Sequence, residues 1–415
     1  MNEREETNNK SFWKGVATGL AMAVVISLIA FGGTRVYRDY QKIQRALSAE
    51  NEEQTTVANS ETMKKLTVLE ETIKKYFWQD TDVEQLEDGV YKGLLESLDD
   101  PYSVYYTEEE LKELQEQTEG IYYGIGAYIS QNLETGYVQI SKIIKNTPAE
   151  ESDLQQGDYI YMVDGEDMQG QESSYVVSKI KGEEGTYVTL SVLREGIADP
   201  IDIEVERRKI ESPTVEYEML DNGIAYIQIV EFDLVTTQQF ETAYKQAQAD
   251  GMKGLILDLR SNPGGNLSTV CDIARMILPK GLIVYTEDKY GERVEYTCDG
   301  SKEIKVPLVV MTNGYSASAS EILAGAVKDY GIGTLVGTTT YGKGIVQKVI
   351  NLSDGSAVKL TVSNYFTPNG NNIHKKGIEP DVVVEFDAQQ YADGVDNQLE
   401  TAKEVIAEKL PQEEQ

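Results

Sequence analysis

Apolar runs alternate with helical patterns along the carboxyl-terminal half of the chain. Residues 223–229, 255–260 and 306–311 are mostly apolar and predict strands, of which the last two should be buried. Residues 238–249 and 322–327 carry apolar side chains at helical intervals. Further strands are predicted at residues 336–350 and 357–366. Strands that alternate with helices in this way predict an α/β domain.

The part of the chain before this domain has two other patterns. Residues 66–76 and 86–94 carry apolar side chains at helical spacing, and Thr107 with Glu110 has the sequence of a capping box that begins a third helix. Residues 119–208 instead alternate polar and apolar positions between glycine-containing turns, which predicts a β-rich unit. We therefore expect a helical region followed by a β-rich domain.

Near the amino terminus, Gly15 to Thr34 is a run of 20 residues without a charge. A helix of this length spans ~30 Å, the hydrocarbon thickness of a bilayer. The alternative is a cleaved signal peptide, for which residues 30–32 form a poor cleavage site and the run is long. We favour an uncleaved membrane anchor with a polar stalk after it. Basic residues flank the run on both sides, so charge does not fix its orientation.

Composition narrows the classes of partner and chemistry. The 415 residues are enough for two or three domains, and the net charge of −32 argues against nucleic acid and anionic membrane surfaces as main partners. Cys271 and Cys298 are too few for a disulfide framework, and we favour unpaired thiols. The sequence has one histidine and no cysteine pair at metal-ligand spacing, so we expect no metal and no cofactor.

A serine-rich segment, Ser316 to Glu321, lies between the strand at 306–311 and the following helix. A helix start offers free backbone N–H groups and a positive dipole end, which stabilise a serine alkoxide or an oxyanion. The plainer interpretation is that small residues cap the helix and let it pack close to the sheet.

A second segment, Tyr341 to Gly344, favours the chemical interpretation. It places Lys343 between two glycines, 25 residues after Ser318. A serine nucleophile needs a base, and lysine fills that role in the Ser-Lys variant of the triad. The other candidate is the single histidine, His374, in a polar loop.

These motifs resemble those of the carboxyl-terminal processing (tail-specific) proteases, a family of serine endopeptidases. The resemblance extends from about Thr62 to about Glu385. The matching motifs are Ser316-Ala317-Ser318-Ala319-Ser320-Glu321, Tyr341-Gly342-Lys343-Gly344 with Gln347, and Asp258-Leu259-Arg260-Ser261-Asn262-Pro263-Gly264-Gly265. It implies that Ser318 is the nucleophile, Lys343 the general base and Gln347 the residue that orients the lysine.

An oxyanion hole is expected from backbone N–H groups near the serine. Gly264 and Gly265 expose such donors without side-chain obstruction, and with Ala319 they would bind the oxyanion, as the resemblance also implies. A plain turn before the next helix is the alternative for either glycine.

The β-rich unit resembles a PDZ domain of the bacterial, protease-linked kind. Its carboxylate-binding loop would be Tyr123-Gly124-Ile125-Gly126. Glycines allow backbone N–H groups to converge on a terminal carboxylate while the bound peptide adds a strand. A tight turn between strands is the alternative for this Gly-x-Gly.

Together these inferences predict a multidomain fold with an α/β core like those of crotonase and ClpP, an inserted PDZ domain, an amino-terminal helical segment and a transmembrane anchor. The predicted parts are a cytoplasmic tail and anchor (1–36), a polar stalk (37–60), a helical region (61–118), a PDZ domain (119–208), a catalytic domain (209–388) and an acidic tail (389–415). The resemblance implies an extracytoplasmic catalytic domain and a helical region that helps to form a homodimer.

The predicted activity is endoproteolysis of proteins near their carboxyl termini, with the PDZ domain presenting the substrate's tail. Lys343 must be neutral to act, and lowering its pKa from ~10.4 to ~7.5 costs about 4 kcal/mol. Because the negative net charge favours the ammonium, desolvation near Ile345 and Val346 has to dominate, and Gln347 would hold the amine from the same strand face. Two other classes are weighed: a non-catalytic binder of protein tails, which retention of Ser318 and Lys343 disfavours, and a crotonase-like acyl-group enzyme, which the PDZ-like segment disfavours.

Overall fold

A computed structural model describes residues 56–132 and 135–410 of the chain. The chain consists of two compact units, residues 1–87 and 88–415. The run predicted as a membrane anchor, residues 15–34, lies outside the described residues. Within the described residues, no helix has both the length and the apolar character needed to cross a membrane.

The first unit contains helix α2, Ser60–Tyr76, as its apolar spacing predicted. Asn59 caps the helix, since its side-chain oxygen accepts the N–H groups of Glu61 and Thr62. No residue of α2 is buried. Helix α3, Val83–Glu96, crosses the boundary between the units and also has no buried residue.

The second unit begins with a strand and a capped helix. Strand β1, Val104–Tyr106, is followed by helix α4, Glu108–Glu119. The predicted capping box is confirmed, because Thr107 Oγ1 accepts the N–H of Glu110 and the Glu110 carboxylate accepts the N–H of Thr107. The helix ends at Gly120, whose φ of 69° is left-handed and therefore suits glycine.

The segment predicted as a PDZ domain folds around its own apolar core, with strand β7 burying every second residue. Its main sheet has the order β3-β4-β5-β7-β8, with β6 paired to β5, and β2 pairs with β9 in a separate two-stranded sheet. The elements are β2 Ile121–Gly124, β3 Ala127–Gln131, β4 Val138–Ile143, α5 Pro148–Glu151, β5 Tyr159–Val163, β6 Glu166–Asp167, α6 Ser173–Ile180, β7 Tyr187–Leu193, β8 Ile201–Glu206 and β9 Arg208–Glu211. Strand β3 is therefore an edge strand.

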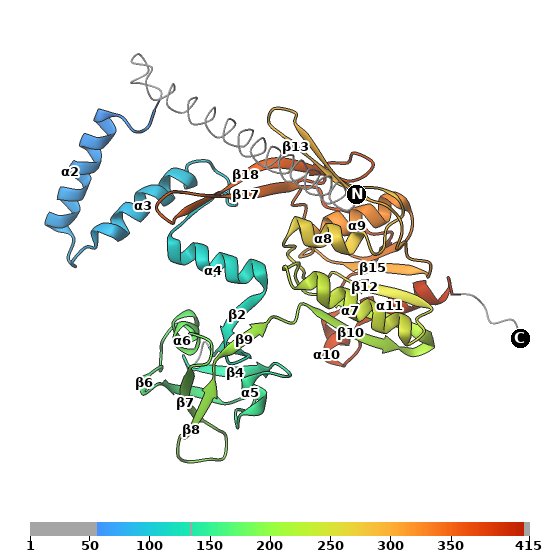
Figure 1. Cartoon of the computed structure of the whole chain (residues 1–415), viewed down its shortest axis with the longest axis horizontal. Helices are drawn as coiled ribbons and strands as arrows, with labels where there is room; N and C mark the ends of the chain where they lie inside the picture. Colours follow the sequence, from blue (N-terminus) through green and yellow to red (C-terminus); the bar gives the residue numbers. More distant parts are fainter. Residues whose placement is uncertain (1–55, 133–134, 411–415) are drawn as a thin grey trace, which may run out of the picture. The chain divides into compact units, whose positions relative to one another are not determined.

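The α/β domain is built on a six-stranded sheet of order β10-β11-β12-β15-β16-β19, parallel except for β10 (Figure 1). Its strands are β10 Val215–Leu220, β11 Ile224–Ile229, β12 Gly254–Asp258, β15 Leu308–Thr312, β16 Thr334–Gly337 and β19 Val382–Val383, with a 3₁₀ turn, η1, at Asp221–Gly223. The helices are α7 Thr236–Ala249, α8 Leu267–Ala274, α9 Ala319–Tyr330, α10 Ala388–Ala392 and α11 Asn397–Ala407.

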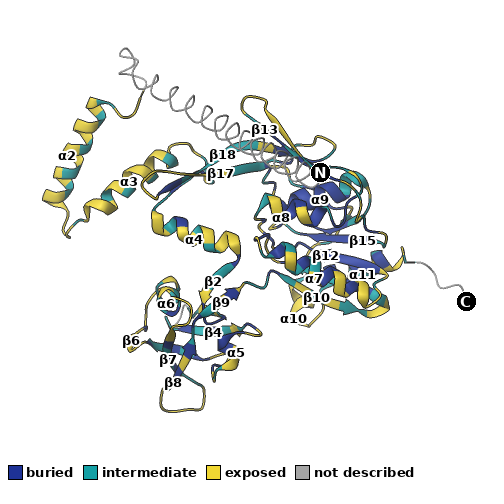
Figure 2. Cartoon of the chain, viewed as in Figure 1, coloured by how far each residue is buried: buried dark blue, intermediate teal, exposed yellow. Residues whose placement is uncertain are grey.

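Both faces of this sheet are covered, which explains why its central strands are apolar without alternation. Leu255 and Leu257 of β12 pack in the core shared with α7, α8 and α9, whereas Ile256 packs in a second core with α11. Every residue of β12 and β15 is buried (Figure 2). Helix α11 lies in the segment predicted as an acidic tail, yet its Ala402 and Ile406 are fully buried.

A second, five-stranded sheet carries the strand that follows Lys343. Its strands β13 Gly281–Asp288, β14 Arg293–Cys298, β17 Ile345–Asn351 and β18 Ala357–Phe366 join β1, in the order β1-β18-β13-β14 with β17 paired to β18. Strand β18 pairs with both β1 and β17. The segment around Tyr102, which precedes β1, therefore belongs to the same sheet as the strand that follows Lys343.

Candidate active site

Ser318 lies immediately before helix α9 in a strained backbone conformation. Its φ of 55° and ψ of −112° lie outside the regions that L-residues favour. The surrounding structure holds this geometry, since the Tyr365 hydroxyl donates to the Ser318 carbonyl at 3.0 Å and the Glu321 carboxylate accepts the Ser318 N–H at 2.9 Å. Such strain is typical of functional positions.

The three serines of the segment have different surroundings. Ser316 is fully buried, and its hydroxyl donates to the Leu259 carbonyl at 2.7 Å. Ser320 is also fully buried, and its hydroxyl donates to the Asn262 carbonyl at 3.0 Å. Ser318 alone of the three lines the cavity that also contains Lys343. Ser316 and Ser320 thus connect the start of the helix to the loop after β12 by hydrogen bonds, whereas the Ser318 side chain lies at the cavity, where it can react.

A buried carboxylate connects the serine segment to the lysine segment. Glu321 is fully buried and accepts four hydrogen bonds: from the N–H groups of Ser318 (2.9 Å), Gly342 (2.7 Å) and Lys343 (2.8 Å), and from the Thr340 hydroxyl (2.6 Å). The sequence motif contained Glu321 but gave it no role. Only the fold shows that one side chain fixes the two candidate catalytic segments at the same place.

The segment Pro263-Gly264-Gly265, called the glycine loop below, packs directly against Ser318. A Cβ atom on Gly264 would lie 2.7 Å from the Ser318 Cβ and 2.9 Å from the Ala319 nitrogen, so only glycine fits there. Ala319 is the first residue of α9, and its N–H therefore has no carbonyl partner within the helix. Gly265 has a φ of 136°, and a Cβ atom added to it would lie 2.5 Å from the Phe232 carbonyl oxygen.

The two glycines differ in the availability of their N–H groups. The Gly264 N–H donates to the Asn262 side chain at 2.8 Å. Among the described residues the Gly265 N–H has no recorded acceptor. Of the pair predicted to contribute to an oxyanion hole, Gly265 is therefore the freer donor in this arrangement.

Lys343 is half-buried, and burial lowers the pKa of its amine below the ordinary value. The positive charge of Lys359 lowers this pKa further. The carboxylates of Asp100 and Glu321 act in the opposite direction but do not outweigh burial. This is the balance that the sequence predicted for a lysine base, in which desolvation dominates.

Among the described residues no hydrogen bond joins the Lys343 amine to Ser318. Lys343 Nζ instead lies over the Tyr102 ring, 4.4 Å from its centroid, in a cation–π arrangement. The Tyr102 hydroxyl lies 3.4 Å from the hydroxyl of Tyr341. Sequence interpretation assigned the region before residue 118 no chemical role, because nothing local relates Tyr102 to a lysine 241 residues later.

Gln347 lines the same cavity as Lys343, but the expected geometry between them is not formed. Its amide donates to the Thr361 hydroxyl at 3.2 Å. The alternation argument fails because β17 begins at Ile345, after Lys343, and its register with β18 shifts between Val346 and Gln347. The two side chains are therefore not successive positions on one strand face.

The cavity has a volume of about 500 Å³. It is lined by residues from α4, the loop after β11, the glycine loop, the start of α9 and β17, among them Thr118, Asp233, Gly265, Ser318, Lys343, Val346 and Gln347. His374 is not among its lining residues; its backbone packs against Gly344, and its Nδ1 is buried without a partner in the described part of the chain.

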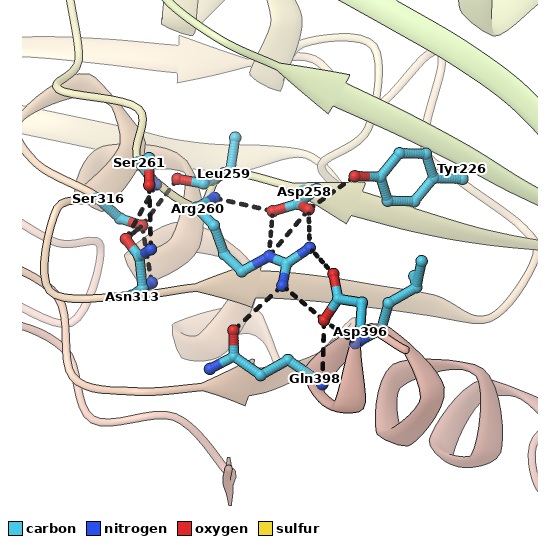
Figure 3. A network of polar contacts seen from close by, with 10 residues as sticks. Tyr226, Asp258, Leu259, Arg260, Ser261, Asn313, Ser316, Asp396 and Gln398 are labelled. Carbon is cyan, nitrogen blue, oxygen red and sulfur yellow. Dashed lines mark hydrogen bonds and ion pairs between the residues drawn. The ribbon is translucent and has the colours of Figure 1, made fainter. Parts of the chain in front are cut away.

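A polar network joins Arg260, which precedes the glycine loop, to Asp396 at the start of helix α11 (Figure 3). Arg260 donates to Asp258 at 2.7 Å and to Asp396 at 2.7 Å, and Asp258 also accepts the Tyr226 hydroxyl at 2.8 Å. The next residue, Ser261, donates its N–H to the Asn313 side chain at 2.9 Å.

The predicted carboxylate-binding loop is only partly a loop. Tyr123 and Gly124 belong to β2 and pair with β9. The carbonyls of Ile125 and Gly126 accept the N–H groups of Ala149 (2.8 Å) and Ile144 (3.0 Å). Gly126 has a φ of 86° and immediately precedes the edge strand β3.

Neither a metal site nor a disulfide is present in the described residues. No group of three or more potential ligands is found there that would hold a metal ion. Cys271 and Cys298 are buried free thiols, and burial raises the pKa of Cys271 to about 12.

Known protein families match three parts of the chain. Residues 223–384 match the family described as peptidase family S41, residues 123–205 match the PDZ domain, and residues 23–110 match the activating protease CtpB N-terminal domain.

Individual relatives match along most of the chain. Carboxy-terminal processing protease CtpA of Bacillus subtilis is 38% identical over 323 residues, covering 78% of this chain and 69% of the relative. CtpB of the same organism is 33% identical over 372 residues, covering 88% and 77%. The solved structure of a Bacteroides fragilis protein assigned to the S41 proteases shares the fold, with a TM-score of 0.51 at 18% identity over 82% of this chain and 97% of that one.

Proposed function

Because the chain belongs to peptidase family S41 and to its carboxy-terminal processing proteases, we propose that it cleaves protein substrates near their carboxyl termini with a Ser318–Lys343 dyad. The chain is a serine peptidase with a PDZ domain, and its protein substrates follow from that. The observation that carries the dyad is the Glu321 carboxylate, which binds the backbone N–H groups of both residues at one cavity.

In the proposed reaction the neutral Lys343 amine accepts the Ser318 hydroxyl proton as the oxygen attacks the scissile carbonyl. The resulting ammonium returns the proton to the leaving amine, which leaves an acyl-enzyme. Water then attacks the ester, with Lys343 again taking and returning a proton. Among the described residues Lys343 Nζ lies over the Tyr102 ring without a hydrogen bond to Ser318, so this step needs the amine to turn toward the serine hydroxyl.

The oxyanion is stabilised by backbone N–H groups. Ala319 provides one, at the start of α9 where the helix dipole adds to it. Gly265 provides the second in this arrangement, since the Gly264 N–H is bonded to Asn262. A rotation of the Asn262 side chain would release Gly264 as an additional donor. Gln347 would orient Lys343 after the amine leaves Tyr102.

The PDZ domain recognises the substrate's carboxyl terminus in this proposal. The N–H groups of Ile125 and Gly126 bind the carboxylate, and the peptide pairs with β3. The edge position of β3 supports this, because an edge strand has unpaired backbone groups for an added strand.

The remaining parts of the architecture are proposed on the sequence patterns. The domain limits are those given above, the core is of the crotonase and ClpP kind, and residues 15–34 anchor the chain once in the cell membrane with the catalytic domain outside the cytoplasm. Full-length protein should then resist alkaline carbonate extraction from membranes. A mature form that begins near Gly33 would show a cleaved signal peptide instead.

The dyad is tested by Ser318→Ala and Lys343→Ala. Each should reduce kcat/KM for a protein substrate at least ~10³-fold while thermal unfolding stays close to wild type. A fluorophosphonate probe should label the wild type and fail to label Ser318→Ala. His374→Ala is the control and should keep its turnover. Retained cleavage in either dyad variant would refute the assignment of that residue.

A further inference from the structure

The loop between β11 and α7 places a carboxylate in the catalytic cavity without a partner. Asp233 lines the cavity with Ser318 and is 6% exposed. Its backbone is well bonded, since its N–H donates to Thr236 Oγ1 at 2.9 Å and its carbonyl accepts the Thr269 hydroxyl at 3.2 Å. Its side-chain oxygens have no hydrogen bond or ion pair with any residue that the structure describes.

Asp233 is connected to the reacting serine through a short series of contacts. The neighbouring Phe232 donates its N–H to the Gly264 carbonyl at 2.8 Å and accepts the Asn266 N–H at 2.7 Å. Gly264 is the residue packed against Ser318. Asp233 is therefore one residue away from a segment that is hydrogen-bonded to the glycine loop, and its side chain lies against Gly120 at the end of α4 while lining the same cavity as Ser318.

The opposite side of this loop borders the end of helix α4. The Leu234 N–H donates to the Thr118 carbonyl at 3.0 Å, and Leu114, Gln117 and Thr118 also line the cavity. The carboxylate is thus at the end of the cavity nearer to the connection with the PDZ domain, which leads on from α4 through Gly120 to β2.

A mostly buried carboxylate without a donor is unfavourable when ionised. Burial raises the pKa of Asp233 to about 7, and the neighbouring negative charge of Glu231, at the cavity rim, adds to this. The positive groups that line the cavity, Lys343 and Lys359, form no ion pair with it: they lie over Tyr102 and Tyr106. Above this pKa the end of the cavity at Asp233 carries negative charge that an incoming cation would neutralise.

We propose that Asp233, assisted by Glu231, is a specificity-determining residue that binds a lysine or arginine side chain of the substrate close to the scissile bond. A basic side chain is the occupant that fits, because it supplies both the positive charge and the N–H donors that the carboxylate lacks. A metal ion does not fit as well, since no third ligand accompanies the two carboxylates among the described residues. The inference rests on the proposed function, because it assigns a subsite to that cavity.

The test compares matched peptides that carry lysine or norleucine at one position at a time, over three positions on either side of the cleaved bond. The measured quantity is the ratio of kcat/KM for lysine to kcat/KM for norleucine, in the full-length protein. At one position we expect a ratio of about 10 or more at pH 8, since a charge-assisted hydrogen bond contributes roughly 1.5–3 kcal/mol.

The ratio should also rise with pH through about 7, because Asp233 is neutral below this pKa and ionised above it. Titration of Lys343 affects both peptides alike and cancels from the ratio. Asp233→Asn should remove the preference and its pH dependence, and Glu231→Gln should reduce it only in part. Asp233→Ser is the second variant, should the asparagine disturb folding.

Two outcomes would overturn the proposal: a wild-type ratio at or below 1 at every position, or a preference that persists unchanged in Asp233→Asn. The first needs no variant, so poor folding of the mutants leaves the proposal testable. Failure of the dyad is a separate result, since it would appear as retained cleavage in Ser318→Ala whatever the ratio is.

Discussion

Tyr102 and Glu321 act on the candidate dyad in opposite ways. Glu321 accepts the backbone N–H groups of both Ser318 and Lys343, whereas the Tyr102 ring contacts the Lys343 amine in a cation–π arrangement. A cation–π contact favours the ammonium form over the neutral amine that the reaction needs. Burial of Lys343 and the charge of Lys359 favour the neutral amine. The resting pKa of Lys343 is lowered from its ordinary value by this balance.

Replacing Tyr102 by leucine should shift the pH dependence of cleavage. A cation–π contact contributes ~0.5–2 kcal/mol in favour of the ammonium, so its loss should lower the pKa of Lys343 further. Activity rises as Lys343 loses its proton, and the acid limb of kcat/KM should therefore move to lower pH. Tyr102→Phe keeps the ring and should leave the limb in place. An acid limb that stays unchanged in Tyr102→Leu would show that the ring does not tune the base.

Glu321→Gln should impair catalysis without affecting recognition of the substrate's tail. The amide keeps one acceptor oxygen and turns an NH₂ group toward N–H donors, so about half of the four hydrogen bonds are lost. We expect kcat to fall at least ~10²-fold, with a smaller change in KM and slower labelling of Ser318 by a fluorophosphonate. Glu379→Gln, at an exposed glutamate, is the matched control. Equal losses in both variants would contradict the proposed role of the buried carboxylate.

Helix α11 is the element whose contribution differs most from its sequence appearance. Its Ala402 and Ile406 fill the face of the sheet opposite α9, and Asp396 at its start binds Arg260. The Arg260 N–H donates to Asp258, and the N–H of the next residue, Ser261, donates to Asn313. These bonds hold the chain just before the glycine loop. Burial raises the pKa of the Asp396 carboxyl, but the hydrogen bonds from Arg260 outweigh it and hold the pKa below its usual value. Through Asp396 and Arg260, helix α11 therefore stabilises the segment that leads into the glycine loop.

Asp396→Asn should destabilise the catalytic domain in a pH-dependent manner. A charge-assisted bond contributes roughly 1.5–3 kcal/mol, which should appear as a lower unfolding temperature at pH 7. Because the folded pKa is depressed, this contribution is present above the unfolded pKa of ~3.8 and is lost as pH falls through the folded value. The difference between wild type and variant should therefore shrink in strong acid. Asp393→Asn, at an exposed position, should match wild type; a similar destabilisation there would point to net charge as the cause.

For the whole molecule, the connection between the PDZ domain and the catalytic cavity is the route by which the proposed tail recognition would be coupled to cleavage. The connection runs from the PDZ domain through β2 and Gly120 to α4, whose last turn lines the catalytic cavity. A Cβ atom on Gly120 would lie 2.6 Å from Val235 Cγ2, so this connection is tightly packed against the loop that carries Asp233. Strand β3, with its free edge, is the surface of the PDZ domain that suits a bound peptide.

A pair of substrates that differ only in an acid or an amide at the carboxyl terminus tests tail recognition in the unaltered protein. Loss of a charge-assisted bond to the Gly126 loop should reduce kcat/KM for the amide roughly 10- to 150-fold. Gly126→Val should lower cleavage of the acid, but its φ of 86° and the Thr147 Cβ atom 2.3 Å from the added Cβ make that variant a distorting one. The substrate pair is therefore the decisive measurement. Equal values for acid and amide would refute tail recognition while leaving the dyad intact.

The sequence by itself determined the local helices and strands and the types of residue that form the candidate site. Apolar runs predicted β12 and β15, helical spacing predicted α2 and α7, and the Thr107 capping box began α4 as expected. These features depend on residues within a few positions of one another, where periodicity and capping act. The motifs around Ser318 and Lys343 also fixed the family, because their order and spacing are read without knowledge of the fold.

Only the tertiary structure decided which residues meet. Glu321 bonds to Lys343 across 22 residues, Arg260 bonds to Asp396 across 136, and Lys343 stacks on Tyr102 across 241. The strand alternation that related Lys343 to Gln347 failed for the same reason, since pairing with β18 sets where β17 begins and where its register shifts. Contacts of this kind follow from packing of the whole core, which no local pattern of hydrophobic and polar residues specifies.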